Sequence, residues 1–301
     1  GANYSVALTS IVDTTTNYRE NPIGIDTDSL RFGWRMESNL IGQQQAAYEI
    51  NLYKASDSSK AIWTTGKVDD GVSTGILYDG EPLDAATGYN WVVTVWDEQG
   101  KTYVSDPAYF ETGVTNEQDW NAAEFIQLPV SSAAPIFRTE QTVDGTVDSA
   151  RLYITAMGVY EAYINGEKVG KINEDGTTTY HHMNPGYGNG TATIGYETYD
   201  VTSYLNDDAP FALSILAGTG WNDGKGDGAM GSTSGQPAVK AMMVINYTDK
   251  DGNQQQKKIV TNTEDWKGTL DGPITVNGVF YGGDRKSTRL NSSHITISYA
   301  V

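Results

Sequence analysis

Apolar and polar residues alternate in several short segments near the start of the chain. Ala46–Tyr53 alternates with a period of two, which predicts a half-buried strand. Tyr89–Trp96, with the sequence YNWVVTVW, is apolar on nearly both faces and predicts a central strand. A turn sequence (DEQGK) then leads into Thr102–Phe110, a predicted partner strand. This pattern favours an immunoglobulin- or fibronectin type III-like β-sandwich over residues 1–113.

Alternation returns after a more polar stretch at 114–134, which we interpret as a linker that packs on its neighbours. Asn165–Gly166 is a strong hairpin signal between apolar segments. Further strands are predicted at 151–156, 159–164, 211–217, 238–247 and 254–261. The sequence therefore predicts an all-β chain of two tandem sandwiches, the second a jelly-roll lectin-like sandwich over residues 135–283.

The composition agrees with packed β-domains and excludes several kinds of partner and site. Of 301 residues, 38% are hydrophobic and 19% charged, which is typical of a folded chain. The net charge of −18 argues against nucleic acid and anionic membranes as partners, because both carry the same sign of charge. The absence of cysteine excludes disulfides and thiolate sites, and the three histidines, His181, His182 and His294, nearly exclude a three-histidine metal centre.

Neither end of the sequence is expected to be the natural terminus of the protein. The chain opens Gly-Ala-Asn without Met, so we expect the natural start to be missing; localisation stays open, with a secreted or periplasmic protein favoured. Residues 284–301 (DRKSTRLNSSHITISYAV) are basic in an otherwise acidic chain. From Asp284 to His294 they resemble the in-frame translation of a common short-read sequencing adapter. We therefore expect this tail to be non-native and the natural chain to continue differently after Gly283.

A series of motifs in the second half resembles the N-terminal lectin-like domain of bacterial α-L-rhamnosidases. In chain order these motifs are APIFR at Ala134, ARLYITAMGVYEAYINGEKVG at Ala150, NPGY at Asn184, YETYDVTSYL at Tyr196, LAGTGWNDG at Leu216 and DGPITVNGVFYGG at Asp271. The first domain resembles the fibronectin-like module that precedes it in that family, through NPIGIDTDSLRFGWRMES at Asn21, IWTTGKV at Ile62 and YNWVVTVWD at Tyr89. The resemblance covers nearly all of residues 10–283.

This resemblance implies a non-catalytic role for the chain. Members of the family hydrolyse terminal α-L-rhamnosides with inversion, using a carboxylic acid and a carboxylate. In the family these two acids lie in a downstream (α/α)6 barrel whose motifs are absent here, so no catalytic residue is assigned. The implied partners are that barrel and a rhamnose-containing glycan or glycoside. Acid pairs such as Asp207/Asp208 could imitate a glycosidase pair, but solvated turn acids are the better interpretation.

The best candidate for ligand binding is GTGWNDGKGDG at residues 218–228. Trp221 offers a flat apolar face for a sugar ring, and Asn222 and Asp223 offer oxygens that could bond hydroxyls. The resemblance requires no cofactor, but Asp223 and Asp227 could hold calcium, which oxygen ligands suit. In the competing interpretation, Trp221 packs against the adjoining barrel. The same loop departs from the family pattern, because Asn222 follows Trp221 where a tyrosine is common.

Two other function classes stay open at this point. One is a free-standing carbohydrate-binding module with no enzyme attached. The other is the sugar-binding N-terminal sandwich of a β-galactosidase-like enzyme. The fibronectin-like module and the GTGW motif favour the rhamnosidase interpretation over both. Elsewhere in the chain, Trp34 and Trp91 are expected to be core or interdomain aromatics, and His181–His182 a loop pair rather than a metal site.

Overall fold

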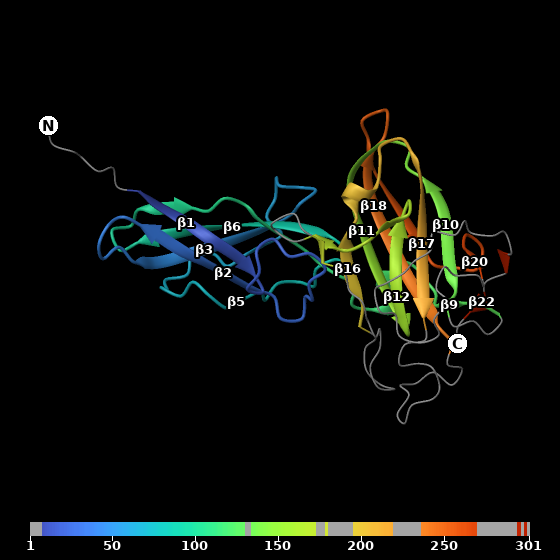
Figure 1. Cartoon of the computed structure of the whole chain (residues 1–301). Helices are drawn as coiled ribbons and strands as arrows, with labels where there is room; N and C mark the ends of the chain where they lie inside the picture. Colours follow the sequence, from blue (N-terminus) through green and yellow to red (C-terminus); the bar gives the residue numbers. More distant parts are fainter. Residues whose placement is uncertain are drawn as a thin grey trace, which may run out of the picture. The chain divides into compact units, whose positions relative to one another are not determined.

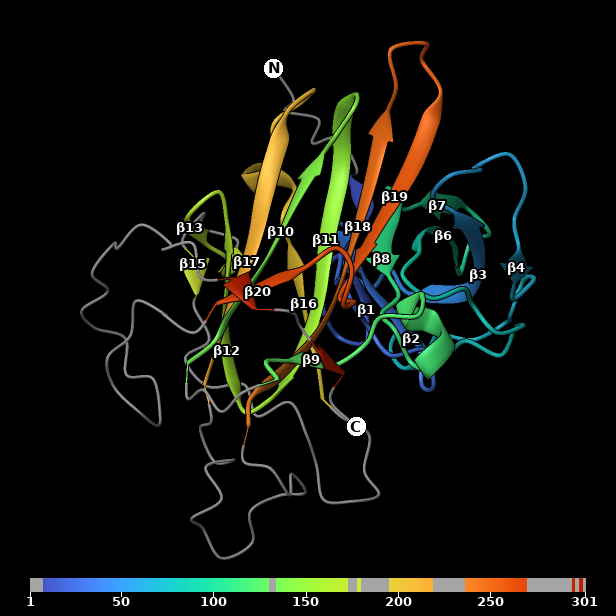
Figure 2. The ribbon, with the colours of Figure 1, turned by 90° about the vertical axis from the view of Figure 1, so that its right-hand side faces the viewer.

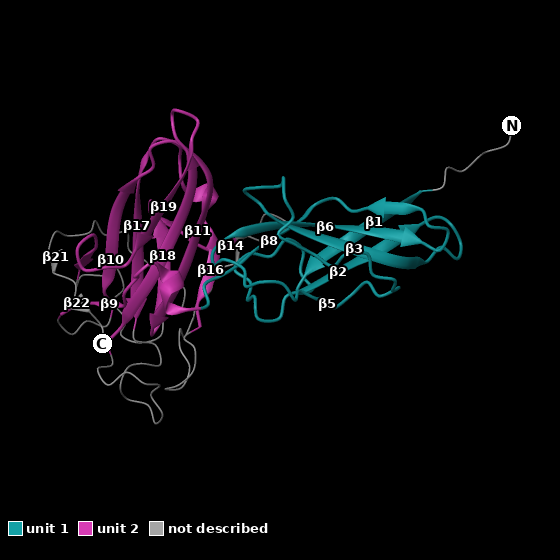
Figure 3. Cartoon of the chain, turned by 180° about the vertical axis from the view of Figure 1, so that it is seen from behind, with its two compact units in different colours: residues 1–115 teal, residues 116–301 magenta. Residues whose placement is uncertain are grey.

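The computed structural model describes residues 8–129, 134–172, 178–179, 195–218, 236–269, 294–295 and 298–299. Within these residues the regular structure is β-strand, apart from two short 3-10 helices, η1 (Glu117–Trp120) and η2 (Thr202–Tyr204). The chain divides into two compact units, Gly1–Thr115 and Asn116–Val301 (Figures 1 and 3). The predicted all-β fold of two sandwiches is confirmed.

The first unit consists of two antiparallel sheets. One has the strand order β1 (Thr9–Thr16), β2 (Arg31–Ser38), β5 (Ile76–Leu77). The other has the order β4 (Trp63–Thr64), β3 (Gln45–Lys54), β6 (Gly88–Asp97), β7 (Thr102–Val104), and β8 (Ala108–Glu111) also pairs with β6. The predicted central strand is thus β6, and its alternate residues Tyr89, Trp91, Val93 and Val95 are buried.

Tryptophans anchor the core of this unit. Trp91 is fully buried, and its indole N–H donates to the Thr16 hydroxyl at 3.1 Å. Trp34 is also buried and packs against Tyr48, with ring centroids 5.2 Å apart. Both are core residues, one of the two roles that the sequence predicted for them.

The predicted partner strand at 102–110 is two strands, β7 and β8. Between them the hydroxyl of Ser105 accepts the backbone N–H of Val93 at 3.0 Å, while the Ser105 N–H donates to the Val93 carbonyl at 2.9 Å. Pro107 follows and has no N–H to offer a ladder. A side chain therefore replaces a backbone acceptor, and the strand is interrupted.

The second unit is a larger sandwich, and Figure 2 shows its long strands. The first sheet has the order β13 (Glu167–Lys168), β12 (Val159–Ile164), β17 (Pro210–Gly218), β10 (Ile136–Thr142), β20 (Lys267–Thr269), β21 (His294–Ile295). The second has the order β16 (Glu197–Asp200), β11 (Thr146–Met157), β18 (Ala238–Thr248), β9 (Ile126–Gln127), β22 (Ser298–Tyr299), with β19 (Gln254–Val260) also paired to β18. A separate short pair joins β14 (Lys171–Ile172) and β15 (Thr178–Thr179).

The core lies between these two sheets. Every second residue of β11 and β18 enters it, including Leu152, Ile154, Met243 and Ile245. Inside this apolar core the hydroxyls of Tyr160 and Tyr199 lie 3.1 Å apart and satisfy each other. Alternate residues of these two long strands therefore form the inward face of their sheet.

Three hairpin turns of the described residues form at turn sequences rich in Asn, Asp and Gly. Asn165 and Gly166 both have positive φ, 51° and 80°, as the two-residue turn between β12 and β13 requires. In two other hairpins an aspartate begins a five-residue turn, Asp97 between β6 and β7 and Asp249 between β18 and β19. In each turn the carboxylate accepts N–H groups two and four residues later.

The boundary between the units differs from the predicted linker. Residues predicted as a linker over 114–134 include η1 and β9, and both belong to the second unit. β9 pairs with β18 through Ile126 opposite Val239. Pairing with a strand more than a hundred residues away leaves no local pattern, which is why the sequence did not reveal it.

The tail at 284–301 contributes two short pairings. β21 pairs with β20 and β22 pairs with β9, each at the edge of its sheet. Its non-native origin stays a prediction.

Deleting residues 284–301 should leave the thermal midpoint within about two degrees. Two-residue edge strands resemble surface features, which usually alter stability by less than ~0.5 kcal/mol, and one kcal/mol shifts a domain of this size by about 2–4 °C. Differential scanning calorimetry of both forms measures the change. A loss of many degrees would show that the tail is native structure.

Candidate functional site

The residues predicted to bind a ligand lie outside the described part of the chain. Trp221, Asn222, Asp223 and Asp227 all fall within 219–235, and His181–His182 fall within 180–194. What the structure does give is the position at which the chain leaves and rejoins the fold around these segments.

The residues described on the two sides of segment 219–235 lie at one end of the second sandwich. Gly218, the last residue of β17, lies opposite Val159, and Ala238, the first residue of β18, lies opposite Met157. Met157 and Val159 flank the tight turn between β11 and β12, where Gly158 has a φ of 114°. The described residues on the two sides of the predicted site, Gly218 and Ala238, therefore lie in different sheets, each opposite a residue next to this turn.

Side-chain contacts hold the described residues at this end. The hydroxyl of Thr155 donates to the Gly195 carbonyl at 2.5 Å, at the point where description resumes after residue 194. The Gln236 amide donates to the Leu128 carbonyl at 2.6 Å, just before β18 begins. These contacts give both segments fixed attachment points.

A buried carboxylate lies close to this end, on the outer face of the sheet that contains β12. The Glu161 side chain is only 2% exposed and lies 3.2 Å from the ammonium of Lys168. The Tyr163 hydroxyl donates to its other oxygen at 2.9 Å. Beside it, Ile136, Val159 and Leu216 form a small apolar cluster. Because both carboxylate oxygens accept hydrogen bonds, the group serves as a structural anchor.

The sequence did not single out this cluster, although a signal was present. Glu161 and Tyr163 are two residues apart on one strand and so share a face. The Asn165–Gly166 turn fixes Tyr163 opposite Lys168. The hairpin register thus predicts the neighbourhood of all three side chains.

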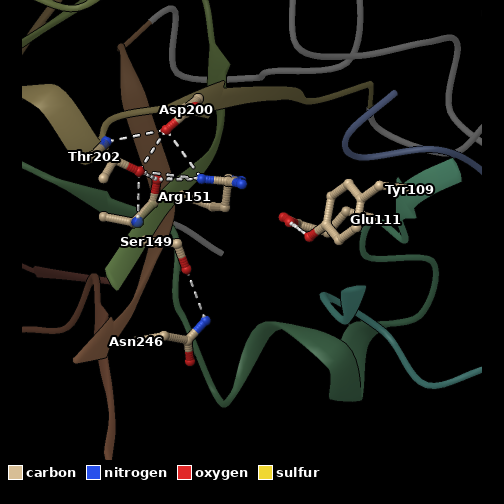
Figure 4. Close-up of polar contacts among 8 residues, drawn as sticks. Tyr109, Glu111, Ser149, Arg151, Asp200, Thr202 and Asn246 are labelled. Carbon is tan, nitrogen blue, oxygen red and sulfur yellow. Dashed lines mark hydrogen bonds and ion pairs between the residues drawn. The ribbon is translucent and has the colours of Figure 1, made fainter. Parts of the chain in front are cut away.

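A second polar cluster explains two of the family-like motifs. Arg151 of ARLYIT lies opposite Asp200 of YDVT, and their side chains meet at 3.0 Å (Figure 4). The same Asp200 oxygen accepts the Thr202 hydroxyl at 2.6 Å and the Thr202 N–H at 3.1 Å. The Thr202 hydroxyl oxygen in turn accepts the Ala150 N–H at 2.9 Å. These residues fasten η2 to β11, so the motif is structural.

Other polar contacts drawn in Figure 4 are also local to their own units. In the second unit, the Asn246 amide donates to the Ser149 hydroxyl at 3.1 Å, across the β11–β18 ladder. In the first unit, the Tyr109 hydroxyl donates to Glu111 at 2.6 Å. Each contact joins side chains on one sheet face.

Three carboxyl groups have pKa values below the ordinary range. Hydrogen bonds from the Ser59 hydroxyl and N–H lower the pKa of Asp57. Burial alone would raise the pKa of Asp97, but hydrogen bonds from the Lys101 N–H, Gln43 and Tyr103 outweigh burial and lower it. The Asn253 N–H and the Gln255 amide lower the pKa of Asp249. A general acid needs the opposite shift.

Asp207 and Asp208 lie in a turn, in agreement with the interpretation of this pair as solvated turn acids. Both residues are exposed, the Asp207 carboxylate accepts the Val147 N–H at 2.8 Å, and the Asp208 N–H donates to the Gly145 carbonyl at 2.9 Å. Among the described residues no group of three or more His, Asp or Glu side chains could hold a metal ion. Nor does the described part of the chain include a helix long and apolar enough to cross a membrane.

Comparison with known proteins gives the same family for both units. A family model described as a Rha78A-like N-terminal immunoglobulin domain matches residues 11–116. A model described as the α-L-rhamnosidase N-terminal domain matches residues 145–299, a span that includes most of the tail. An α-L-rhamnosidase of Formosa agariphila is 31% identical over 91% of this chain, which covers 31% of that relative's length.

Two solved structures have the same fold over nearly the whole chain. The α-L-rhamnosidase from Dictyoglumus thermophilum matches 97% of this chain and 34% of its own, with a TM-score of 0.75 and 25% identity. The enzyme from Aspergillus terreus matches 98% of this chain and 34% of its own, with a TM-score of 0.71 and 24% identity. The chain thus spans about a third of the length of these relatives.

Replacing Asp200→Ala should destabilise the second unit by about 1–3 kcal/mol, because three hydrogen bonds disappear and the Arg151 side chain, 13% exposed, loses this acceptor. The thermal midpoint should fall by about 3–10 °C. Asp251→Ala, in an exposed turn, is the control and should cost less than ~0.5 kcal/mol. Equal midpoints for the two variants, measured by circular dichroism, would contradict the structural role of Asp200.

Proposed function

Since the chain belongs to the α-L-rhamnosidase family, whose N-terminal domain model matches residues 145–299, we propose that it is a non-catalytic accessory part of such an enzyme. The observation that carries this proposal is the order of the two matches. An immunoglobulin-like domain and the α-L-rhamnosidase N-terminal domain follow one another here. The whole enzyme would hydrolyse rhamnose-containing glycans or glycosides, and this part would position or stabilise its catalytic domain.

The chemistry of the described residues supports a role without catalysis. Inverting hydrolysis needs one carboxylic acid with a raised pKa and one carboxylate, about 6.5–9.5 Å apart. The three carboxyls with shifted pKa values are shifted downward, and Glu161 is bonded to Lys168 and Tyr163. The family resemblance assigns the catalytic pair to a helical barrel, and the described residues contain no α-helix.

The purified chain should release no aglycone from an aryl α-L-rhamnoside above a heat-treated control. The reason is that, by the family resemblance, the acid pair that protonates the leaving group and activates water lies in a downstream barrel. The assay should run from pH 4 to pH 8, so that no protonation state is missed. Turnover that follows the concentration of the purified chain would overturn the proposal.

We further propose that any saccharide site of this chain involves Trp221, Asn222 and Asp223, with calcium at Asp223 and Asp227 as an option. A tryptophan face stacks on the apolar side of a sugar ring, and the amide and carboxylate bond its hydroxyls. The supporting observation is that Gly218 and Ala238, which flank this segment, lie opposite Val159 and Met157 on either side of a tight turn at one end of the sandwich.

Binding of L-rhamnose should be weak, with a dissociation constant of about 0.1–1 mM, because a few contacts must offset lost ligand freedom. Trp221→Ala should abolish measurable binding in calorimetric titration. Trp96→Ala, on the outward face of β6 in the first unit, is the control and should bind as the wild type does. Unchanged binding by Trp221→Ala would remove this loop as the site.

The same titration distinguishes the two roles of Asp223. If it holds calcium, EDTA should abolish binding and lower the thermal midpoint together. If it bonds a hydroxyl only, EDTA should have no effect, while Asp223→Ala should weaken binding by about 1–2 kcal/mol. The absence of any binding would favour Trp221 as packing surface for a further domain.

A further inference from the structure

Lys240 is a buried lysine on the face of the second sandwich that points away from the core. Its neighbours Val239 and Ala241 enter the core, so Lys240 faces outward from β18. Even so, its side chain is only 5% exposed. A charged ammonium removed from water needs compensating partners, because desolvation strongly disfavours an unpaired buried charge.

The Lys240 ammonium contacts a carboxylate and two aromatic rings from one short segment. Its ammonium lies 2.7 Å and 2.8 Å from the two carboxylate oxygens of Glu117. It also lies 4.9 Å from the ring centroid of Trp120 and 5.6 Å from that of Phe125. Two aromatic faces and a carboxylate therefore surround the cation, a combination that stabilises it electrostatically.

This segment is attached to the second unit along its length. The Trp120 ring packs edge-on against Tyr196, with centroids 5.5 Å apart. The Glu124 N–H donates to the Thr261 carbonyl at 3.0 Å, and the Thr261 hydroxyl donates to the Glu124 carbonyl at 2.6 Å. Ile126 then pairs with Val239.

We propose that residues 116–128 form a strap that is an obligatory part of the second unit. Lys240 is the positioning residue that holds this strap against β18. The two family models leave residues 117–144 unassigned, so this role is not part of either match. The strap covers the outer face of β18 around Lys240.

The ion pair between Glu117 and Lys240 joins an exposed carboxylate to a buried ammonium. This difference in exposure makes the proposal testable. The Glu117 side chain is 80% exposed, whereas that of Lys240 is 5% exposed. An ion pair between two exposed groups contributes little to stability. Here the exposed acid compensates a buried charge, so its removal should matter far more than its exposure suggests.

The experiment uses the full chain and measures how often the strap opens. Hydrogen exchange of amides in residues 116–128, and chymotrypsin cleavage after Trp120 and Phe125, both report local opening. Glu117→Gln should raise both rates about tenfold, because the buried ammonium loses its counter-charge. Lys240→Met removes the charge that needs a partner. In that background, Glu117→Gln should change the rates less than about twofold, because the coupled partner is already absent.

A matched control comes from an exposed ion pair in the same unit. Glu140 is 73% exposed and lies 2.8 Å from Arg138, which is 38% exposed. Glu140→Gln should leave the exchange and cleavage of the strap unchanged. Because Glu117→Gln alters an exposed side chain, its comparison with Glu140→Gln is decisive even if Lys240→Met does not fold.

Two results would overturn the proposal. One is a Glu117→Gln chain whose strap opens no faster than that of Glu140→Gln. The other is an equally large effect of Glu117→Gln with and without Lys240→Met. The second result would mean that Glu117 acts on η1 alone, where Asn116 and Asp119 already form a capping box.

Discussion

The antiparallel pairing of β11 with β18 is the constraint on which the second unit depends. The two strands pair along their whole length, from Thr146 opposite Thr248 to Met157 opposite Ala238. Their inward residues form the core with the other sheet, and β16, β9 and β19 extend the ladder on both sides. Because successive side chains point to opposite faces, burying one face still leaves the other to be covered.

The outward face of this sheet contains two basic residues that are paired with acids. Arg151 and Lys240 both lie on the outward face of the β11–β18 sheet, and both are largely buried. Each is matched to an acid, Arg151 to Asp200 at the end of β16 and Lys240 to Glu117 in η1. Other acids, such as Asp97 and Asp249, accept backbone N–H groups in hairpin turns. Many of the acidic residues therefore have structural roles, which weakens any assignment of catalysis from composition.

The proposed accessory role agrees with the way in which side-chain pairs hold the strands of the second unit together. The sheets are fastened by buried pairs such as Glu161–Lys168 and Arg151–Asp200. The predicted ligand residues lie between Gly218 and Gln236 in the sequence, outside the described residues. Ligand-binding residues commonly lie on loops that a rigid sandwich holds in place. The motif YDVT, which looks like a functional signature, is explained by the attachment of η2.

Several of the strands and hairpins could be predicted from the sequence, because both depend on neighbouring residues. Alternation identified β3, β11 and β12, a segment apolar on nearly both faces identified β6, and Asn165–Gly166 identified its turn. The ligand residues around Trp221 were chosen from local chemistry and lie outside the described chain. Only the tertiary structure decided that Ser105 interrupts a predicted strand, that Glu161 is buried, and that Glu117 meets Lys240. Such contacts depend on sheet register between distant segments, and the local alternation of residues does not specify that register.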